Sequence, residues 1–366
     1  CTATTTMATS ITYSWERICT DSTPPQARSS HEISFVGGSC YLWGGEHVAR
    51  TPIDSELYIL DLSSDRNGGE GWKKVELAAD SGPPPSPRIA HGQAVLGSRI
   101  FVFGGREGIT MDERPLNDLH YFDCETKRWS GPVQCTGETI PAARSFHKMT
   151  AANGILYVFG GCGVSGRLAD LYSFDANSNT WTALPSCDRI AGRGGPGFDA
   201  VQDGNALIVA TGFSGQENND VHLFDLQLKV WRTIEPGQGI QDPEAFRPRS
   251  VCPFFTHDQG RFMILFGGEV DTSQRGHEGA GAFASDIVCI DCGTETATER
   301  GRPAVVRAVN GGGADTPCAR GWTAMAGFPS DCGSGCAILF GGLTGDDENP
   351  ERLNDTWKLT VSVVEA

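Results

Sequence analysis

The chain repeats one pattern of apolar and polar positions six times. Each unit begins with an arginine, continues with a stretch of alternating polarity, and then enters a second stretch that is almost wholly apolar. That second stretch, for example Ile155–Phe159, is rich in β-branched and aromatic residues, which predicts a buried strand. A glycine pair ends it in five units, where the backbone must take positive φ or pass close to a neighbour. The arginines are Arg28, Arg88, Arg144, Arg193, Arg249 and Arg320, and the pairs are Gly44-Gly45, Gly104-Gly105, Gly160-Gly161, Gly267-Gly268 and Gly341-Gly342.

A third strand is expected after the glycine pair and a polar loop. An aspartate precedes this strand in five units, as in Asp118-Leu119 and Asp170-Leu171, whereas the first unit has a glutamate there, in Glu56-Leu57. The fourth unit also departs from the pattern, because Thr211-Gly212 replaces its glycine pair. A tryptophan comes later in four units, where a large ring can pack between adjacent sheets. These tryptophans are Trp72, Trp129, Trp181 and Trp231.

The spacing of the units predicts an all-β propeller with six blades. Successive arginines stand about 49 to 71 residues apart, which fits propeller blades better than helical solenoids or leucine-rich repeats. The last unit supplies three strands, while Ile11–Ile18 is a separate strand-like segment with Trp15 at its centre. Pairing the two would complete the sixth blade and leave no open edge at the seam.

One domain is therefore expected over residues 11–366, with residues 1–10 as a flexible lead. The blades are predicted at about 24–75, 84–133, 140–185, 190–235, 246–300 and 317–362, with the strand at 11–18 joining the last one.

Charge and cysteine usage narrow the expected partners and location. The formal net charge of −16 would repel phosphate backbones and acidic lipids, so neither nucleic acid nor membrane partners are expected. The chain has no long apolar run, and its Thr/Ala-rich start does not resemble a secretory signal. Its 13 cysteines are scattered without an even framework, which favours reduced thiols in a cytoplasmic protein. Cys289-x-x-Cys292 is read as structural, with a zinc or redox site as the alternative.

Candidate chemistry lies in the loops that follow the glycine pairs, because variable loops on a rigid scaffold are where sites are usually built. The loop of the fifth unit places Glu269, Asp271 and His277 within nine residues. Mixed carboxylate and imidazole ligands with open positions suit non-haem Fe(II). The alternative is that this polar loop is simply solvated. The six repeated arginines are expected to tie the blades together through carboxylates and backbone carbonyls.

A set of short motifs is spread through the repeat: Ala27–His31, Tyr41–Glu46, Arg50–Asp54, Ala143–His147, Tyr157–Gly161, Asp220–His222, Phe266–Val270, Gly276–Gly281 and Ala319–Thr323. With these motifs the chain resembles a known family, the kelch-repeat nitrile-specifier, epithiospecifier and thiocyanate-forming proteins of plants. The resemblance implies a six-bladed kelch propeller.

The resemblance implies a chemistry and a set of residues for it. Specifier proteins are Fe(II)-dependent and divert the thiohydroximate released from glucosinolates towards nitriles, epithionitriles or thiocyanates. Their iron motif is E-x-x-x-D-x-x-x-H; here Glu269 and His277 match its ends, but Ser273 stands at the middle position, so Asp271 would have to supply the third metal ligand. By the same resemblance, Arg106, Arg167 and Trp322 are the catalytic-pocket residues, and the two arginines would hold a sulfate group.

Two functions are therefore predicted for the channel mouth. The first is a pocket for a small anionic sulfur-containing molecule, with a lyase-type specifier activity that depends on Fe(II). The second is a kelch module that binds a protein partner through the same loops without catalysis. Because Ser273 replaces the family's middle ligand, the residues leave both functions open.

Overall fold

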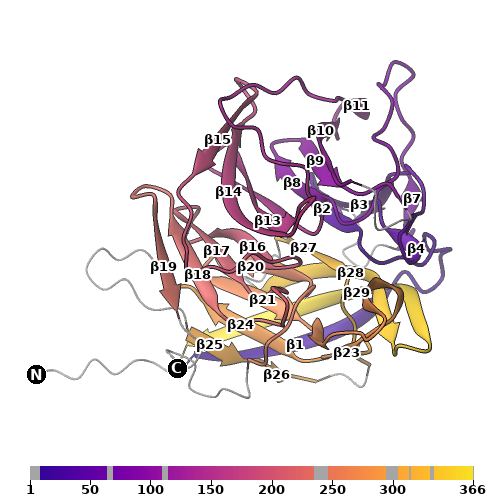
Figure 1. Cartoon of the computed structure of the whole chain (residues 1–366). Coiled ribbons are helices and arrows are strands. Elements are labelled where there is room, and N and C mark those ends of the chain that lie inside the picture. The colour runs from indigo at the N-terminus through magenta and orange to yellow at the C-terminus, as the bar shows by residue number, and fades with distance from the viewer. Residues whose placement is uncertain are drawn as a thin grey trace, which may run out of the picture.

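The computed structural model describes residues 9–63, 69–108, 114–234, 246–293, 304–312, 315–329 and 334–365. Within this part, the chain forms six sheets of four or five strands that follow one another in sequence order around a ring (Figure 1). The innermost strands contact each other in cyclic order, β2 to β8, β12, β16, β20, β27 and back to β2. This closed cycle confirms the predicted six-bladed propeller.

The first five blades each contain four strands in the order inner to outer. Blade 1 holds β2 (Glu32–Val36), β3 (Ser39–Trp43), β6 (Tyr58–Asp61) and β7 (Lys73–Lys74), and blade 2 holds β8 (Gly92–Leu96), β9 (Arg99–Gly105), β10 (Leu116–Asp123) and β11 (Arg128–Ser130). Blade 3 holds β12 (Lys148–Ala152), β13 (Ile155–Cys162), β14 (Arg167–Asp175) and β15 (Thr180–Leu184), and blade 4 holds β16 (Gly197–Val201), β17 (Ala206–Ala210), β18 (Val221–Asp225) and β19 (Val230–Ile234). Blade 5 holds β20 (Phe254–His257), β21 (Phe262–Phe266), β24 (Ile287–Asp291) and β25 (Ala304–Arg307).

The sixth blade joins the two ends of the chain. It consists of β27 (Ala324–Phe328), β28 (Gly335–Gly345), β29 (Pro350–Glu365), β1 (Thr9–Ile18) and a short outer strand β26 (Val309–Asn310). Strand β1 pairs antiparallel with β29 along its whole length, with Trp15 opposite Leu359, so the indigo N-terminal strand lies beside the yellow C-terminal one in Figure 1. The predicted seam is confirmed, whereas the parallel pairing of β26 with β1 was not foreseen.

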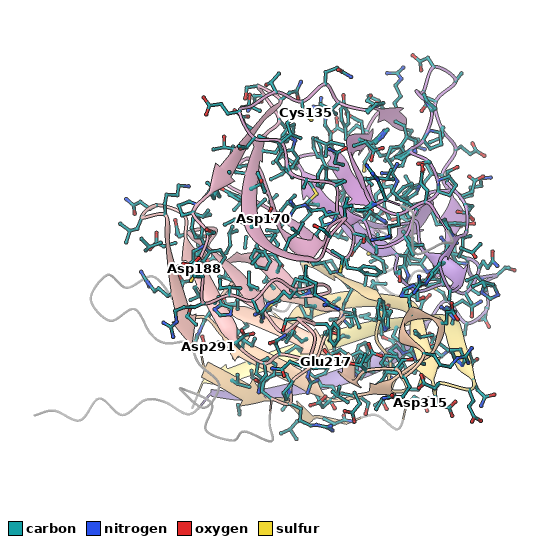
Figure 2. The ribbon with its side chains drawn as sticks, in the orientation of Figure 1. Cys135, Asp170, Asp188, Glu217, Asp291 and Asp315 are labelled. Carbon is teal, nitrogen blue, oxygen red and sulfur yellow. The ribbon has the colours of Figure 1, made fainter. Side chains whose placement is uncertain are left out.

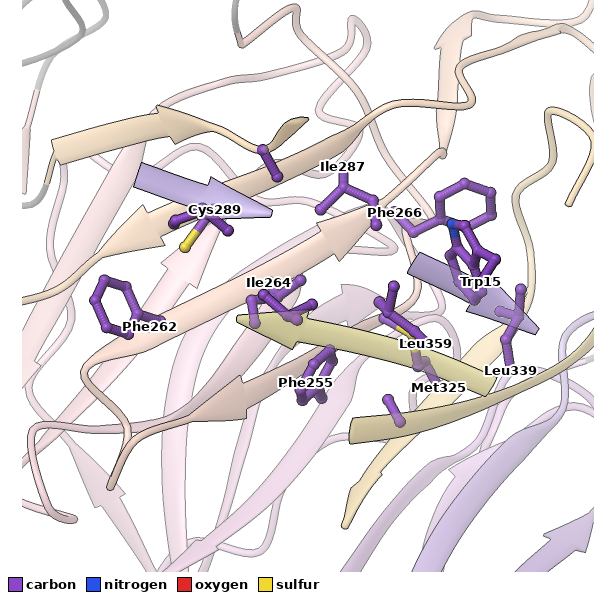
Figure 3. Close-up of a cluster of buried hydrophobic side chains, with 14 of the residues drawn as sticks. Trp15, Phe255, Phe262, Ile264, Phe266, Ile287, Cys289, Met325, Leu339 and Leu359 are labelled. Atoms are coloured by element: carbon purple, nitrogen blue, oxygen red, sulfur yellow. The ribbon is translucent and has the colours of Figure 1, made fainter. Parts of the chain in front are cut away.

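Apolar side chains pack between neighbouring blades. Each buried cluster draws on two adjacent sheets, and Figure 3 shows the one between blades 5 and 6, where Trp15 lies close to Phe266. Trp129 and Trp181 occupy equivalent positions between earlier blades, as the repeat pattern predicts. A blade that buries its faces only against its neighbours is stable only within the ring.

The repeated arginines are fully buried, and the partners of their side chains lie within the same blade, whereas the backbone carbonyl of Arg144 and its equivalents accepts an N–H from a glycine of the neighbouring blade. Arg144 donates to both carboxylate oxygens of Asp170, at 2.6 and 2.9 Å, and to the carbonyl of Gly160. Each such arginine thus ties the start of the inner strand to the second and third strands. Arg28 is the exception, because its nearest carboxylate, Asp54, is 3.8 Å away.

The loops carry three further elements. Two short hairpins, β4 (Glu46–Val48) with β5 (Thr51–Pro52) and β22 (Glu269–Asp271) with β23 (Ala282–Phe283), rise from blades 1 and 5. A 3₁₀ turn, η2 (Gly276–Glu278), lies inside the second hairpin's loop. Among the described residues, none forms a helix long and apolar enough to span a bilayer.

Candidate functional site

A cavity of about 340 Å³ opens at the end of the propeller where the glycine pairs lie. All six blades contribute to its wall. Its lining residues are Arg50, Ile89, Arg106, Gly108, Phe146, Cys162, Arg167, Gly194, Gly195, Phe213, Ser250, Val251, Glu269, Thr272, Gly276, His277 and Trp322. Five of the six residues that the sequence singles out therefore meet in one place, although up to 216 positions separate them (Arg106 to Trp322, 322 − 106).

Two of these residues place positive charge on the side formed by blades 2 and 3. Arg106 follows strand β9 and donates from Nε to the hydroxyl of Ser145 at 2.9 Å. Arg167 begins strand β14, and its guanidinium lies over the ring of Phe213, 4.6 Å from the ring centre. Arg106 and Arg167 both line the cavity, and a guanidinium group is a fixed cation whose planar N–H donors match an oxyanion, so both arginines suit recognition of a carboxylate, sulfate or phosphate.

Three rings form an apolar wall inside the cavity. Trp322 packs edge-to-face against Phe146 and His277, with ring centres 5.6 and 4.9 Å away, and Phe146 also contacts His277. The indole Nε1 of Trp322 is buried and has no hydrogen-bond partner among the described residues. The cavity thus offers an aromatic surface on which the apolar part of a ligand can pack.

His277 is held by a carboxylate from the opposite end of the sequence. Its Nε2 lies 2.9 Å from Oε2 of Glu46, which is 1% exposed. Glu46 also accepts hydrogen bonds from the hydroxyls of Ser29 and Ser30 and from the backbone N–H of Arg50. Burial raises the pKa of Glu46, but His277 and its other donors outweigh that effect, so the pKa lies below its ordinary value and the carboxylate stays charged.

The loop between β22 and β23 is fastened to blade 6. Ser273 donates from its hydroxyl to Asp347, and the same carboxylate accepts the backbone N–H of Gln274 at 2.9 Å. Arg275 donates to the carbonyl of Asp347 at 2.6 Å. Ser273, the residue that departs from the iron motif, therefore acts as a hydrogen-bonding anchor for the loop.

The predicted iron ligands do not converge in this arrangement. Glu269 lines the cavity and accepts the backbone N–H of Gly281, while Asp271 is exposed and lies outside the lining. The Nε2 of His277 faces Glu46. No three His, Cys, Asp or Glu side chains in the described parts of the chain are grouped closely enough to hold a metal ion. The residues as placed do not fit an Fe(II) centre, and iron binding through Glu269, Asp271 and His277 stays a prediction.

Two acidic residues that contact lining residues of the cavity were not foreseen: Glu46 bonds to His277, and Glu217 bonds to Thr272. Glu46 ends one of the motifs that carry the family resemblance, so its position was marked even though its partner was not. Glu217 comes from the fourth-blade loop, and Figure 2 labels it near the lower blades. Burial and the neighbouring Glu269 and Asp271 raise the pKa of Glu217 to about 7. No sequence signal pointed to it.

Comparison with known proteins agrees with this architecture. A family model described as the KLHDC2/KLHL20/DRC7 kelch-repeats domain matches residues 30–268, more than half of the chain. The chain belongs to the kelch-repeat family. A solved kelch-like structure titled "Structure of YjhT" superposes with a TM-score of 0.62, covering 93% of this chain and 98% of the other, at 18% identity. That likeness supports the fold alone.

Curated relatives point in two directions. N-(sulfonatooxy)prop-2-enimidothioate sulfolyase of Thlaspi arvense is 28% identical over 321 residues, which cover 82% of this chain and 84% of that protein. This relative supports the resemblance of the kelch chain to specifier proteins. Kelch domain-containing protein 1 of Mus musculus is 32% identical over 189 residues, and these cover 47% of this chain but only 45% of the mouse protein.

Proposed function

We propose that this kelch propeller binds a small anionic organic molecule with a sulfate-like group at the channel mouth and acts on it as a specifier-type lyase. The observation that carries the proposal is the meeting of Arg106, Arg167 and Trp322 around one cavity of about 340 Å³. The likeness to the Thlaspi arvense sulfolyase, whose name describes a sulfonatooxy compound, supports this class of ligand. The proposal includes a cytoplasmic location, in keeping with free thiols at every described cysteine.

The side chains suggest how such a ligand would lie. Arg106 and Arg167 offer charge-assisted hydrogen bonds to the oxygens of a sulfate group. Their guanidinium groups also stabilise negative charge that grows on a departing sulfate, which is how fixed cations assist such a step. The organic part of the ligand packs on Trp322 and Phe146, which form the apolar wall. No step is assigned to iron, because Glu269, Asp271 and His277 do not converge.

Product analysis tests this proposal. The protein is incubated with myrosinase and a glucosinolate, with and without Fe(II), and nitrile and isothiocyanate are measured by gas chromatography. Wild type is expected to raise nitrile above the blank, and Arg106→Ala and Arg167→Ala to return it towards the blank. Arg99→Ala is the matched control, because Arg99 is about half exposed at the far end of β9 and pairs with Asp123. Nitrile at the blank level with wild type would refute the activity.

The second candidate is a protein-interaction module. It is favoured by the match to the KLHDC2/KLHL20/DRC7 kelch domain and by the likeness to mouse kelch domain-containing protein 1. In that case the same loops would contact a partner, and neither arginine substitution would change product ratios. Direct binding of a small sulfate ester to the purified protein separates the two functions, because only the first one predicts it.

A further inference from the structure

A ring of backbone hydrogen bonds surrounds the propeller axis beneath the cavity. It involves the residue two positions after each blade arginine, and every member donates its N–H to the carbonyl of the member in the preceding blade. The six bonds run from Ser30 to Trp322, Ala90 to Ser30, Phe146 to Ala90, Gly195 to Phe146, Val251 to Gly195 and Trp322 to Val251, with N···O distances of 2.7 to 3.0 Å. The cycle is complete because the first residue bonds to the last.

All six ring residues have left-handed backbones, with φ between 49° and 58°. This conformation is ordinary for Gly195 but unfavourable for bulky residues, and most unfavourable for a β-branched one such as Val251. Strain that persists in a well-packed region commonly marks a position with a function. Of the six ring residues, Val251 is therefore the one whose side chain suits its backbone conformation least, which marks it as a candidate for a functional role.

Four of the six ring residues form the floor of the cavity. Phe146, Gly195, Val251 and Trp322 line both the cavity and a second, smaller pocket of about 40 Å³, which Ser30 and Ala90 also line. The floor is uneven, since Phe146, Val251 and Trp322 carry large side chains while Gly195 has none. Val251 also reaches over its neighbour, because a Cβ built on Gly195 would lie 2.6 Å from Cγ1 of Val251.

We propose that Val251 determines which ligands the cavity accepts, by limiting the size of the apolar group that can rest on the floor. In a six-bladed ring, blade 5 stands across from blade 2, so Val251 faces the side that carries Arg106. A sulfate ester held by the arginines must direct its organic group towards Val251 and Trp322. The isopropyl group then leaves room for a short chain and excludes a longer one. This inference rests on the proposed function.

Calorimetry with alkyl sulfates of increasing length, from methyl to octyl, tests the inference on the whole protein. The variants are Val251→Ala and Val251→Gly. Glycine is expected to fold, because Gly195 already holds the same ring conformation. Burial of one CH₂ group contributes about 0.8 kcal/mol, so each additional methylene that the cavity can bury strengthens binding about fourfold. The ratio of hexyl to methyl sulfate affinity should therefore rise at least tenfold in Val251→Gly and less in Val251→Ala.

A buried valine away from the floor serves as the control. Val209 on β17 is fully buried in the cluster between blades 3 and 4, so Val209→Ala should lower the melting temperature without changing the affinity ratio. If the wild type binds alkyl sulfates and Val251→Gly shows the same ratio of hexyl to methyl sulfate affinity, the inference is overturned and the proposed function stands. An equal change in Val209→Ala would also overturn it. A wild type that binds no alkyl sulfate would overturn both.

Discussion

The buried arginine of blade 3 allows a sharp test of what holds each blade together. Arg144 is fully buried, and each of its two terminal nitrogens donates to one carboxylate oxygen of Asp170. Asp170 lies on β14 and is labelled in Figure 2. Asp170→Asn keeps the shape of the side chain but removes its charge and turns an N–H group towards the guanidinium. The guanidinium is then left buried with one acceptor fewer and no counter-charge.

The size of the effect follows from burial. Removing one partner of a buried ion pair costs about 3–5 kcal/mol, because the other charge remains uncompensated. The carboxylate of Asp170 is 34% exposed, so water can replace part of what is lost. We therefore expect the free energy of unfolding to fall by about 2–3 kcal/mol. Urea unfolding followed by tryptophan fluorescence measures it.

Blade 1 provides the matched control. Arg28 is as buried as Arg144, but its carboxylate Asp54 lies 3.8 Å away with a similar exposure of 28%. Asp54→Asn should cost less than about 1 kcal/mol, as expected for a loose pair near the surface. Equal losses in Asp54→Asn and Asp170→Asn would show that close bidentate contact is not what stabilises the blade.

Three further outcomes are expected. Trp15→Ala should destabilise the protein by about 3–5 kcal/mol, because the ring is almost fully buried in the seam; an unchanged melting temperature would contradict the role of β1. Arginine and histidine partners overcome burial and hold the pKa of Asp118 and Asp220 well below the ordinary value, so both carboxylates stabilise the fold above about pH 4 and lose that contribution as pH falls further. Asp118→Asn should therefore flatten the acid limb of a stability curve, and an unaltered limb would refute this. If iron binds at the predicted ligands, anaerobic calorimetry should show weaker Fe(II) binding in His277→Ala, and equal affinity would place any iron elsewhere.

The ring of blades could be predicted from the repeat pattern alone. Alternating and continuous apolar stretches predict strands because side chains of a strand point to opposite faces, and this local property needs no knowledge of distant residues. The recurrence of Arg144 and its equivalents, together with the orphan strand around Trp15, was enough to count the blades and place the seam. The family resemblance added Arg106, Arg167 and Trp322 as neighbours, and the cavity brings all three together.

The contacts of the fifth-blade loop, in contrast, depend on the folded arrangement of the blades. Glu269, Asp271 and His277 are close in sequence, which made a shared metal plausible. In the fold, His277 instead turns to Glu46, 231 positions away, and Ser273 turns to Asp347. A loop side chain bonds to the surface that the fold places beside it, so the local sequence pattern does not predict its partner.

The floor of the cavity likewise depends on the closed ring. The positive φ of Val251 and the hydrogen bond from its N–H to Gly195 exist because two blades meet at the axis. Strand periodicity could predict that each inner strand begins near Arg249 or its equivalents. It could not predict a left-handed valine, because that conformation is unfavourable locally and is imposed by contacts between blades.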